Sequence, residues 1–527
     1  MTPPIPKKVA TITLLDEVSA VISGLRINDI EHFFEGYGLL TKNHFFDPRF
    51  KLGRWDGKIR FFSKGCKTYI QLLPDIIPEL NDRGYDINLK DNRFSFSLDI
   101  ESIDSSYFES YGWELGEHQV RAVNSITQNG HNGIIRVGTG GGKTLITAVL
   151  CDLYVRMGIK MIVIVPSEDL VLQTAKEISQ FTFSVGVYYG KKKEHDLDVI
   201  VSTWQSLNTN KKMLTMFGGI IVDECHGANT STQLAKLLGN EGRNHPVRIG
   251  LTGTLPDYHT DKLTVLCHLG PVRAVVKSSE LIDKGWLSKL NLVLYQFKED
   301  FKDEYKEFIG SLPEDSEYKD LTYTQYKNKV LFPAFDAEKR YLNSNTERLE
   351  TICKAIQRLT DQYGNTFILV NTVNMGKKVE KILTSMECDA IFISSKIKNR
   401  SDIYDLFKTN KNMIAIATLS LASTGLNIPR IFNLATIDQS KSFIRVVQTI
   451  GRGLRKAEDK DMVNVFDFHS DTKYAKRHYN KRLKIFKKED YPYRICKVDY
   501  KSPDCIEQII KEAGKMSKEK IKDEVFG

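Results

Sequence analysis

The chain has 527 residues, of which 41% are hydrophobic and 10% aromatic, so it is long enough for about three or four domains with sizeable cores. Its 75 basic and 66 acidic residues leave a net charge of +9, which suggests an anionic partner such as nucleic acid, although many basic proteins bind none. Eight scattered cysteines without a C-x-x-C pair argue against a zinc site or a disulfide framework. Without a signal-like or membrane-spanning apolar stretch, we expect no membrane partner and a cytoplasmic location.

Residues 1–105 are predicted to form a small α/β domain, because short alternating runs mix with helical patches there. Its most distinctive segment, residues 45–62, interleaves aromatic and basic side chains around Trp55-Asp56-Gly57. Basic head groups in such a segment can reach phosphates while the rings pack beneath them; a basic β-hairpin with an aromatic core is an equally good interpretation. Our hypothesis is duplex-DNA binding through five cations: Arg49, Lys51, Arg54, Lys58 and Arg60.

Residues 106–285 alternate between strand-like and helix-like runs at the spacing of a doubly wound parallel sheet. Each predicted strand ends in a polar or glycine-containing loop, at the sheet edge where ligands bind in open α/β folds. The expected strands are residues 134–137, 160–165, 199–202, 220–223 and 248–252.

The first of these strands runs into a glycine-rich loop and then into Lys143-Thr144. Such a loop before a helix cradles phosphates with backbone N–H groups, while the lysine adds a charge and the hydroxyl of Thr144 can hold Mg²⁺. Val137 replaces the first glycine of the strict pattern, which leaves T-G-x-G-K-T, a form common in helicase-type motors. The predicted phosphate-binding residues are Thr139, Gly140, Gly142, Lys143 and Thr144.

The strand at residues 219–222 ends in Asp223-Glu224. We predict that Asp223 holds Mg²⁺ through water opposite Thr144, and that Glu224 orients and deprotonates the attacking water. An acidic turn after any strand is the alternative, but a phosphate loop about 80 residues upstream makes it the weaker one. The following strand ends in Thr252-Gly253-Thr254, which could link the nucleotide state to the DNA side.

Residues 286–345 are charge-rich and are interpreted as a linker or the start of the second half, and residues 346–480 as a second αβ series. We expect a helix at 347–359 and strands at 366–370, 390–394, 413–417, 434–437 and 463–468. The basic tail, residues 481–527, follows. Cations spaced by three or four from about residue 471 indicate a solvated helix by default and a DNA-backbone contact as the sharper alternative.

Arg452 and Arg455 lie three residues apart and share a helical face. An arginine finger on the far wall of a cleft stabilises charge on a transferring phosphoryl group, and the planar guanidinium suits this task. A basic surface helix is the alternative, which Gln448 and Gly451 at matching positions make weaker. We therefore predict that Gln448, Arg452 and Arg455 take part in catalysis.

In this order, the motifs of residues 110–470 resemble those of the superfamily 2 helicases and translocases. The resemblance implies an α/β chain with two RecA-like, doubly wound parallel-sheet domains after the small N-terminal α/β domain. It implies ATP and Mg²⁺ as cofactors, Gln119 as the residue that reads the adenine base, and Gly425 as a further residue of the nucleotide site. It also implies contacts to the nucleic-acid backbone by Pro166, Ser167, Thr203, Trp204, Gln205, Asn371, Thr372 and Thr418.

Asp47-Pro48-Arg49-Phe50, the run Trp55 to Arg60, and Thr203-Trp204-Gln205 are similar to the UvsW-type family of branched-DNA helicases from T4-like phages. That implies an ATP-driven motor on double-stranded, branched DNA, which migrates Holliday junctions, regresses forks and unwinds R-loops in recombination and repair. An RNA–DNA hybrid is then a further candidate partner. We expect a monomer or a weak oligomer, although the sequence itself does not indicate the oligomeric state. The alternatives are an RNA helicase, the motor subunit of a restriction or packaging complex, and a nucleotide-gated binding protein.

Overall fold

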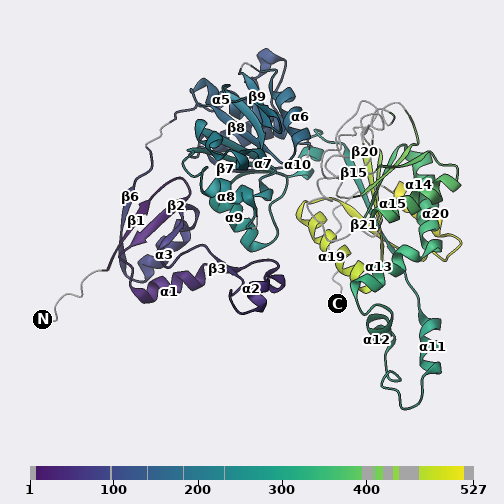
Figure 1. The fold of residues 1–527 in the computed structure, drawn as a ribbon. Coiled ribbons are helices and arrows are strands. Elements are labelled where there is room, and N and C mark those ends of the chain that lie inside the picture. The colour runs from purple at the N-terminus through teal and green to yellow at the C-terminus, as the bar shows by residue number, and fades with distance from the viewer. Residues whose placement is uncertain are drawn as a thin grey trace. The chain divides into compact units, whose positions relative to one another are not determined.

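The computed structural model describes residues 8–94, 98–138, 140–181, 183–230, 232–393, 406, 410–418, 431–437 and 462–515 (Figure 1). The chain divides into two compact units, Met1–Val276 and Lys277–Gly527. Both are built on parallel sheets with helices, which confirms the predicted α/β class. Among the described residues, no helix has the length and apolar character needed to span a membrane.

The N-terminal part of the first unit is a sheet of order β5-β2-β1-β6, in which β1 pairs with β2 antiparallel and with β6 in parallel. Alternation in β1 buries Ala10, Ile12 and Leu14 against Phe33 and Ile76 of the two covering helices. The strands are β1 (Lys8–Leu14), β2 (Ser19–Ser23), β5 (Lys67–Tyr69) and β6 (Tyr85–Asp91), and the helices are α1 (Ile27–Gly36) and α3 (Leu73–Asp82).

A short antiparallel pair, β3 (Gly38–Leu40) and β4 (Lys58–Arg60), carries the aromatic and basic segment between its strands. The segment forms a helical turn, α2 (Pro48–Lys51), because Asp47 caps it by accepting the Arg49 N–H at 2.8 Å and Pro48 takes the first helical position. Phe45 and Phe46 are 50% and 67% exposed. Phe61 and Phe62 at the end of the same segment are buried in the N-terminal core, so the alternative of a hairpin with an aromatic core fits these two rings and not Phe45 and Phe46.

The larger sheet of the first unit has the order β10-β9-β11-β8-β12-β13-β7-β14, and only the β9–β10 pairing is antiparallel. All five residues of β8 are buried, as expected where helices cover both faces. The strands are β7 (Asn132–Val137), β8 (Met161–Val165), β9 (Val185–Tyr189), β10 (Lys192–Lys193), β11 (Val199–Thr203), β12 (Gly219–Asp223), β13 (Val247–Thr252) and β14 (Val272–Val276). The helices are α4 (Glu117–Thr127), α5 (Lys143–Arg156), α6 (Glu168–Ile178), α7 (Trp204–Thr209), α8 (Gln233–Gly239) and α9 (His259–Leu269).

The N-terminal sheet is packed against α9 of this larger sheet. Cys267 belongs to the N-terminal core and Leu263 packs on it, so α9 contributes side chains to both parts. The hydroxyl of Thr260 donates to the Leu40 carbonyl at 2.7 Å, and the Glu17 N–H donates to the Arg243 carbonyl at 2.9 Å. The two parts of the first unit are thus joined by shared core and by hydrogen bonds.

The sheet of the second unit has the order β17-β18-β16-β19-β20-β15-β21, and every pairing that its described strands form is parallel. Its strands are β15 (Lys289–Phe297), β16 (Thr366–Val370), β17 (Ala390–Ile393), β18 (Ile414–Thr418), β19 (Asn433–Ile437), β20 (Met462–Ser470) and β21 (Tyr493–Val498). No strand was predicted for β15, which comes from the 286–345 segment, or for β21, which comes from the 481–527 segment. These two strands pair with each other and extend the sheet beyond β20.

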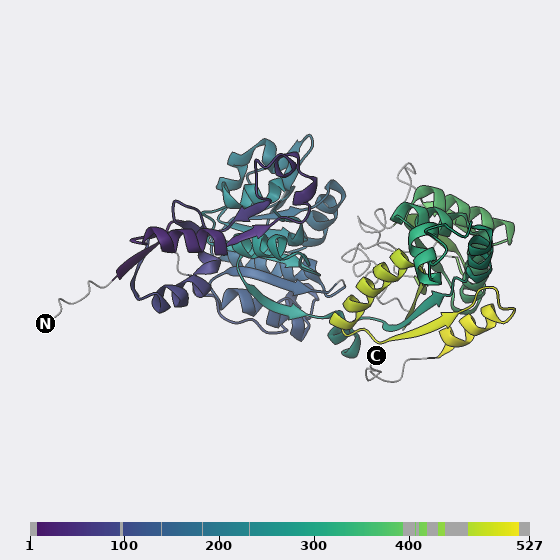
Figure 2. The same ribbon diagram turned by 90° about the horizontal axis from the view of Figure 1, so that it is seen from below.

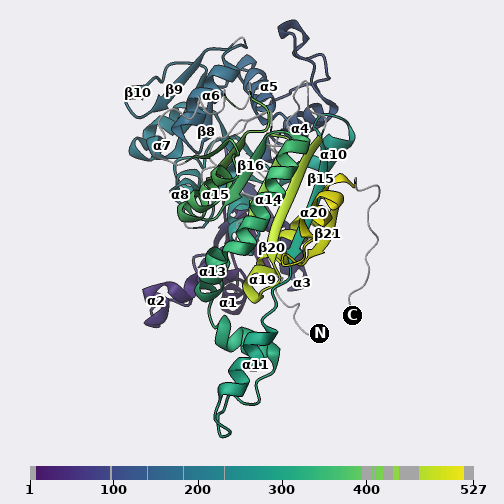
Figure 3. The same cartoon turned by 90° about the vertical axis from the view of Figure 1, so that its right-hand side faces the viewer.

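Helices of the second unit lie on both faces of this sheet. α14 (Thr346–Tyr363), α15 (Val373–Ser385) and α20 (Cys505–Gly514) pack on one face and share a core with Tyr295 and Phe466 (Figure 3). α19 (Lys473–Lys488) lies on the other face (Figure 2). The side chain of Asp467 of β20 reaches this face and pairs with Arg482 of α19, because side chains alternate along a strand. The remaining helices include α10 (Ser278–Asp283), α11 (Lys302–Ser311), α12 (Tyr323–Tyr326) and α13 (Phe335–Ser344).

Candidate functional site

The glycine-rich loop connects β7 to α5, so Lys143 and Thr144 lie in the first turn of α5, where backbone N–H groups lack partners within the helix. Gly140 and Gly142 have φ values of +87° and +77°, a conformation that favours glycine. A Cβ atom at Gly142 would lie 2.1 Å from Nε2 of Gln119, so a larger residue would displace that amide from the loop. Thr139 lies outside the described residues.

The start of α4 is fixed against this loop. Oε1 of Gln119 accepts the Gly116 N–H at 2.9 Å, so this side chain is held at the N-terminus of α4. Nε2 of His118 lies 3.2 Å from the Gly141 carbonyl oxygen. The structure therefore brings Gln119, predicted to read the base, next to the predicted phosphate loop.

The acid pair meets the loop lysine at the carboxyl end of β12. Nζ of Lys143 lies 2.5 Å from Oε1 of Glu224 and 3.8 Å from Oδ1 of Asp223. Nδ1 of His226 lies 3.3 Å from the other Glu224 oxygen. Glu224 has φ 49° and ψ 45°, a left-handed conformation that costs on the order of 1–3 kcal/mol in a residue with a Cβ atom. Surrounding contacts therefore hold this carboxylate in place against local strain.

The pKa values of Asp223 and Glu224 are shifted in opposite directions. Burial raises the pKa of Asp223, and the nearby Lys143 charge only partly opposes it. For Glu224, burial is outweighed by the charges of Lys143 and His226 and by their hydrogen bonds, which hold its pKa well below the usual range. Lys143 thus lies closer to Glu224 than to Asp223 and stabilises the charged form of Glu224 more strongly.

These residues fit a nucleotide and a divalent cation. Oδ1 of Asp223 is buried and accepts no hydrogen bond from the described residues, so it can accept one from a metal-bound water. Thr144 would supply a hydroxyl ligand, Lys143 would bind phosphate, and Gln119 lies at the same loop. When bound, ATP with Mg²⁺ supplies the phosphoryl group and neutralises its charge.

His226 connects the acid pair to the next strand. Its Nδ1 lies 3.0 Å from Oγ1 of Thr252, and that hydroxyl donates to the Thr254 carbonyl at 2.8 Å. Nε of Arg136 donates to the Gly253 carbonyl at 3.4 Å. His226 therefore contacts both Glu224 and residues 252–254. The predicted site omitted His226, although its place after Asp223-Glu224-Cys225 is a local signal.

The predicted backbone-contact residues follow parallel strands, so they lie at carboxyl edges of the two sheets. Three of them begin helices: Thr203 caps α7, with the Ser206 N–H 3.3 Å from its hydroxyl, and Thr372 caps α15 in the same way. Ser167 precedes α6, and its buried hydroxyl has no hydrogen-bond partner among the described residues. In the first unit these residues are Pro166, Ser167, Thr203, Trp204 and Gln205, and in the second they are Asn371, Thr372 and Thr418.

The five cations predicted to bind DNA, Arg49, Lys51, Arg54, Lys58 and Arg60, form an N-terminal patch whose positive charge is partly neutralised by carboxylates. Arg49 pairs with Asp47 at 2.8 Å, and its guanidinium lies 5.0 Å from the centre of the Trp55 ring. Lys58 pairs with Glu35 at 3.1 Å, as does Arg60, which also lies 2.6 Å from Asp56. Lys51 and Arg54 are exposed and make no ion pair within the described residues. The sequence did not indicate Glu35 as a partner, because it lies more than 20 residues upstream.

Gly425, Gln448, Arg452 and Arg455 lie outside the described residues, so their predicted roles in the nucleotide site remain predictions.

Two family models match the chain. Residues 113–257 match "Type III restriction enzyme, res subunit", and residues 347–457 match "Helicase conserved C-terminal domain". The ATP-dependent DNA helicase uvsW of Enterobacteria phage T4 is 24% identical over 445 residues, which cover 80% of this chain and 83% of the phage protein.

Two solved structures show the same fold. The Type ISP restriction-modification enzyme LlaBIII, bound to DNA, has a TM-score of 0.53 at 13% identity and covers 84% of this chain and 37% of its own. A variant of Dbp5 from S. cerevisiae, bound to RNA and ADP BeF3, has a TM-score of 0.51 at 14% identity and covers 77% of this chain and 96% of its own. One neighbour holds DNA and the other RNA, so the fold does not identify the nucleic acid.

Proposed function

We propose that this chain, an ATP-hydrolysing helicase of the superfamily 2 type, uses ATP to move on double-stranded, branched DNA. Its reactions would be Holliday-junction migration, fork regression and R-loop unwinding during recombination and repair. In this proposal residues 1–105 bind DNA, and residues 106–285 and 346–480 form the two halves of the motor. In this proposal Gln448, Arg452 and Arg455, which lie outside the described residues, take part in catalysis as the sequence predicts.

The observation that carries the ATPase chemistry is the meeting of Lys143 with both acids at one sheet edge. Lys143 would bind phosphate oxygens and leave Glu224, which loses the charge that lowers its pKa. Glu224 would then accept the proton of the attacking water more readily. His226 would report this change to Thr252 through the hydrogen bond between them.

DNA is favoured over RNA by the similarity to a phage DNA helicase over most of the chain. The exposed Lys51 and Arg54 on the α2 segment are available for phosphates, and Arg49 is presented beside them on Trp55. A Glu at position 224 and a Cys-His pair after it do not separate DNA motors from RNA motors. An RNA helicase therefore remains the second candidate.

The test is ATP turnover and strand displacement by the purified chain on matched substrates: a four-way junction, a fork, linear duplex, single-stranded DNA and RNA. We expect the junction and the fork to stimulate turnover most and to be unwound only when ATP is hydrolysed. Stronger stimulation by RNA would support the second candidate. Stimulation without displacement on any substrate would indicate a nucleotide-gated binding protein.

A further inference from the structure

Helix α19 (Lys473–Lys488) in the second unit has one buried face and one strongly basic face. The buried face includes Ala475, His478, Tyr479, Arg482, Ile485 and Phe486. No residue of the helix is acidic, so nothing within α19 neutralises the outer face. That face consists of Lys473, Lys476, Arg477, Asn480, Lys481, Lys484, Lys487 and Lys488, all of them exposed.

Buried contacts fix which way this face points. Arg482 donates to both carboxylate oxygens of Asp467 on β20, at 2.9 and 3.0 Å, and both side chains are 3% exposed. The hydroxyl of Thr436 donates to the same carboxylate at 2.7 Å. Tyr479 stacks on His469 of β20 with ring centroids 3.9 Å apart. Because the inner face is anchored in this way, the cations of α19 are held outwards.

The N-terminus of α19 is already occupied by an anion from its own chain. The carboxylate of Glu338 accepts the N–H groups of Tyr474 and Ala475 at 2.8 and 2.6 Å. A ligand phosphate would therefore be bound by the side chains of the outer face and not by the helix end.

The first turns of α19 adjoin a residue predicted to contact nucleic acid. Asn371, directly after β16, lines a cavity of about 210 Å³ together with Ala475 and His478 of α19 and Lys339 of α13. The carboxyl edge of the sheet, where Asn371 lies, is thus adjacent to the buried side of the first turns of α19, and the same turns carry Lys473, Lys476 and Arg477 on their outer side.

We propose that the outer face of α19 binds the sugar–phosphate backbone of duplex DNA and extends the track that begins at Asn371. This rests on the proposed DNA-motor function. A 16-residue helix is about 24 Å long, and a DNA duplex presents a charge about every 1.7 Å, so several lysines can meet phosphates at once. Flexible lysines form contacts that are independent of base sequence, which suits a surface that DNA moves along.

A membrane surface does not fit the same helix. An interfacial helix inserts its apolar face into lipid, but the apolar face of α19 is packed on the sheet and anchored by Arg482. An acidic protein segment is the remaining alternative ligand for the outer face of α19, and poly-glutamate binding is measured to represent it.

The test replaces four outer lysines together, Lys473→Gln, Lys476→Gln, Lys484→Gln and Lys488→Gln, in the full chain. A matched control removes the same charge from exposed lysines elsewhere in the second unit: Lys302→Gln, Lys306→Gln, Lys354→Gln and Lys411→Gln. Binding of a linear duplex and a four-way junction is measured at several salt concentrations by fluorescence anisotropy. Basal ATP turnover and the melting temperature of each variant verify the fold, and the four single variants serve if the quadruple one fails to fold.

The α19 variant is expected to bind DNA more weakly and to lower the magnitude of the slope of log K against log[salt] by up to about 3.6, since each of four lost phosphate contacts removes about 0.9. The control is expected to keep the wild-type slope. An unchanged slope in the α19 variant would overturn the α19 assignment, as would loss of poly-glutamate binding with DNA binding intact. Wild-type chain that neither binds DNA nor is stimulated by it would instead refute the proposed function.

Discussion

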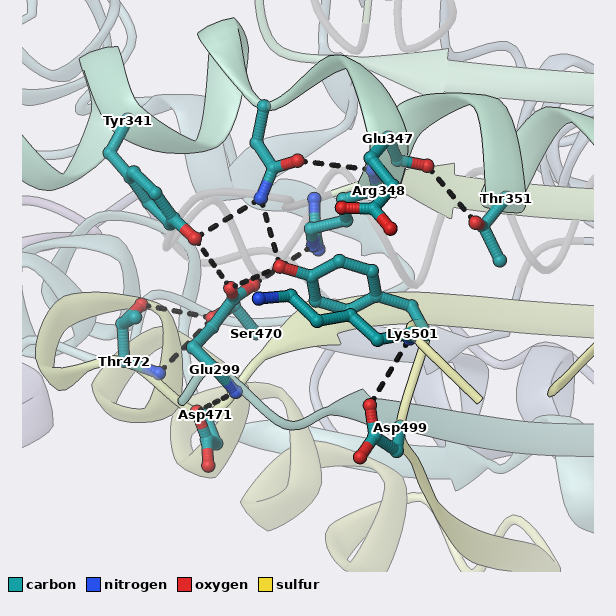
Figure 4. Close-up of polar contacts among 12 residues, drawn as sticks. Glu299, Tyr341, Glu347, Arg348, Thr351, Ser470, Asp471, Thr472, Asp499 and Lys501 are labelled. Atoms are coloured by element: carbon teal, nitrogen blue, oxygen red, sulfur yellow. Dashed lines mark hydrogen bonds and ion pairs between the residues drawn. The ribbon is translucent and has the colours of Figure 1, made fainter. Parts of the chain in front are cut away.

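An acid and a cation meet at the carboxyl edge of a parallel sheet in each of the two units. In the first unit they are Glu224 and Lys143, 2.5 Å apart. In the second they are Glu299, which follows β15, and Arg348 of α14, 3.3 Å apart (Figure 4). The first pair is reachable from solvent, because Lys143 and Glu224 keep 17% and 20% of their side-chain surface exposed. The second pair is sealed, at 0% and 1%.

Neighbouring side chains enclose the second pair. Glu299 accepts the hydroxyls of Tyr341 and Tyr500 at 2.7 and 3.1 Å, and Arg348 lies 5.4 Å from the centre of the Phe297 ring. Each site also has a buried carboxylate oxygen without a hydrogen-bond partner among the described residues: Oδ1 of Asp223 beside Glu224, and Oε1 of Glu299, which lies 3.3 Å from Nε of Arg348. The same charges at the same sheet position thus stabilise the fold when they are enclosed. They become available for chemistry when a ligand can reach them.

The largest expected effect belongs to the open pair. Glu224→Gln keeps the shape of the side chain but cannot accept a proton, so ATP turnover is expected to fall on the order of 10²–10⁴-fold. Binding of a fluorescent ATP analogue and the melting temperature are the controls. Near-wild-type turnover on junction DNA would mean that Glu224 is not the general base.

The sealed pair should behave in the opposite manner. Arg348→Met leaves Glu299 buried without its cation and is expected to lower the free energy of unfolding by about 3–5 kcal/mol, measured by urea denaturation. Adding Glu299→Gln should recover part of this loss, because it removes the uncompensated charge. The ATP turnover per folded molecule is expected to stay the same, and a selective loss of turnover in a stable Arg348→Met variant would erase the distinction between the two pairs.

The buried His268 of the first unit makes the stability of the fold depend on pH. Burial lowers the pKa of His268 to about 4, and its Nδ1 lies 2.7 Å from the Thr264 carbonyl oxygen. Between pH 6.5 and 4 the unfolded chain therefore binds a proton that the folded chain does not, so stability falls as the pH is lowered.

The loss assigned to His268 between pH 7 and 5.5 is about 1 kcal/mol. Paired urea titrations of wild type and His268→Gln at these two pH values measure it. The variant should be less sensitive to pH by this amount, and equal sensitivity would show that His268 does not contribute.

The smallest effect is expected at the link between the open pair and its neighbouring strand. Thr252→Val removes the hydroxyl that His226 contacts at 3.0 Å, a hydrogen bond worth about 1 kcal/mol, which corresponds to a several-fold change in rate. We expect the stimulation of ATP turnover by DNA to decrease by that factor, and Thr252→Ser to restore it. If DNA stimulates ATP turnover equally in all three proteins, the hydrogen bond between His226 and Thr252 does not couple DNA binding to ATP turnover.

Much of the sheet structure was predictable from sequence, because a strand buried on both faces is a continuous apolar run between polar loops. β8 and β12 show this pattern, and their predicted positions agree with the structure to within one residue. β21 was missed because it is an edge strand in which exposed and buried residues mix. The meeting of Lys143 with Asp223 was predicted because both follow strands of one parallel sheet.

Other features depend on contacts that no local pattern encodes. Glu35 neutralises part of the N-terminal patch only because α1 folds against β4. The spacing of cations predicts Arg482 to be one more charge of a basic helix. In the structure its guanidinium is buried and pairs with Asp467 of β20. In both cases the partner is distant in sequence, so charge counting overestimates the free positive surface.

The packing of α9 has a practical and a mechanical consequence. α9 begins five residues after Thr254, and its side chains Leu263 and Cys267 belong to the N-terminal core. A shortened chain that starts after residue 105 would expose this apolar surface to water and would be prone to aggregate. In the intact protein, Thr260 ties α9 to Leu40, at the base of the segment that carries α2. A movement of residues 252–254 can therefore be transmitted along α9 to Leu40 and to the segment that carries α2.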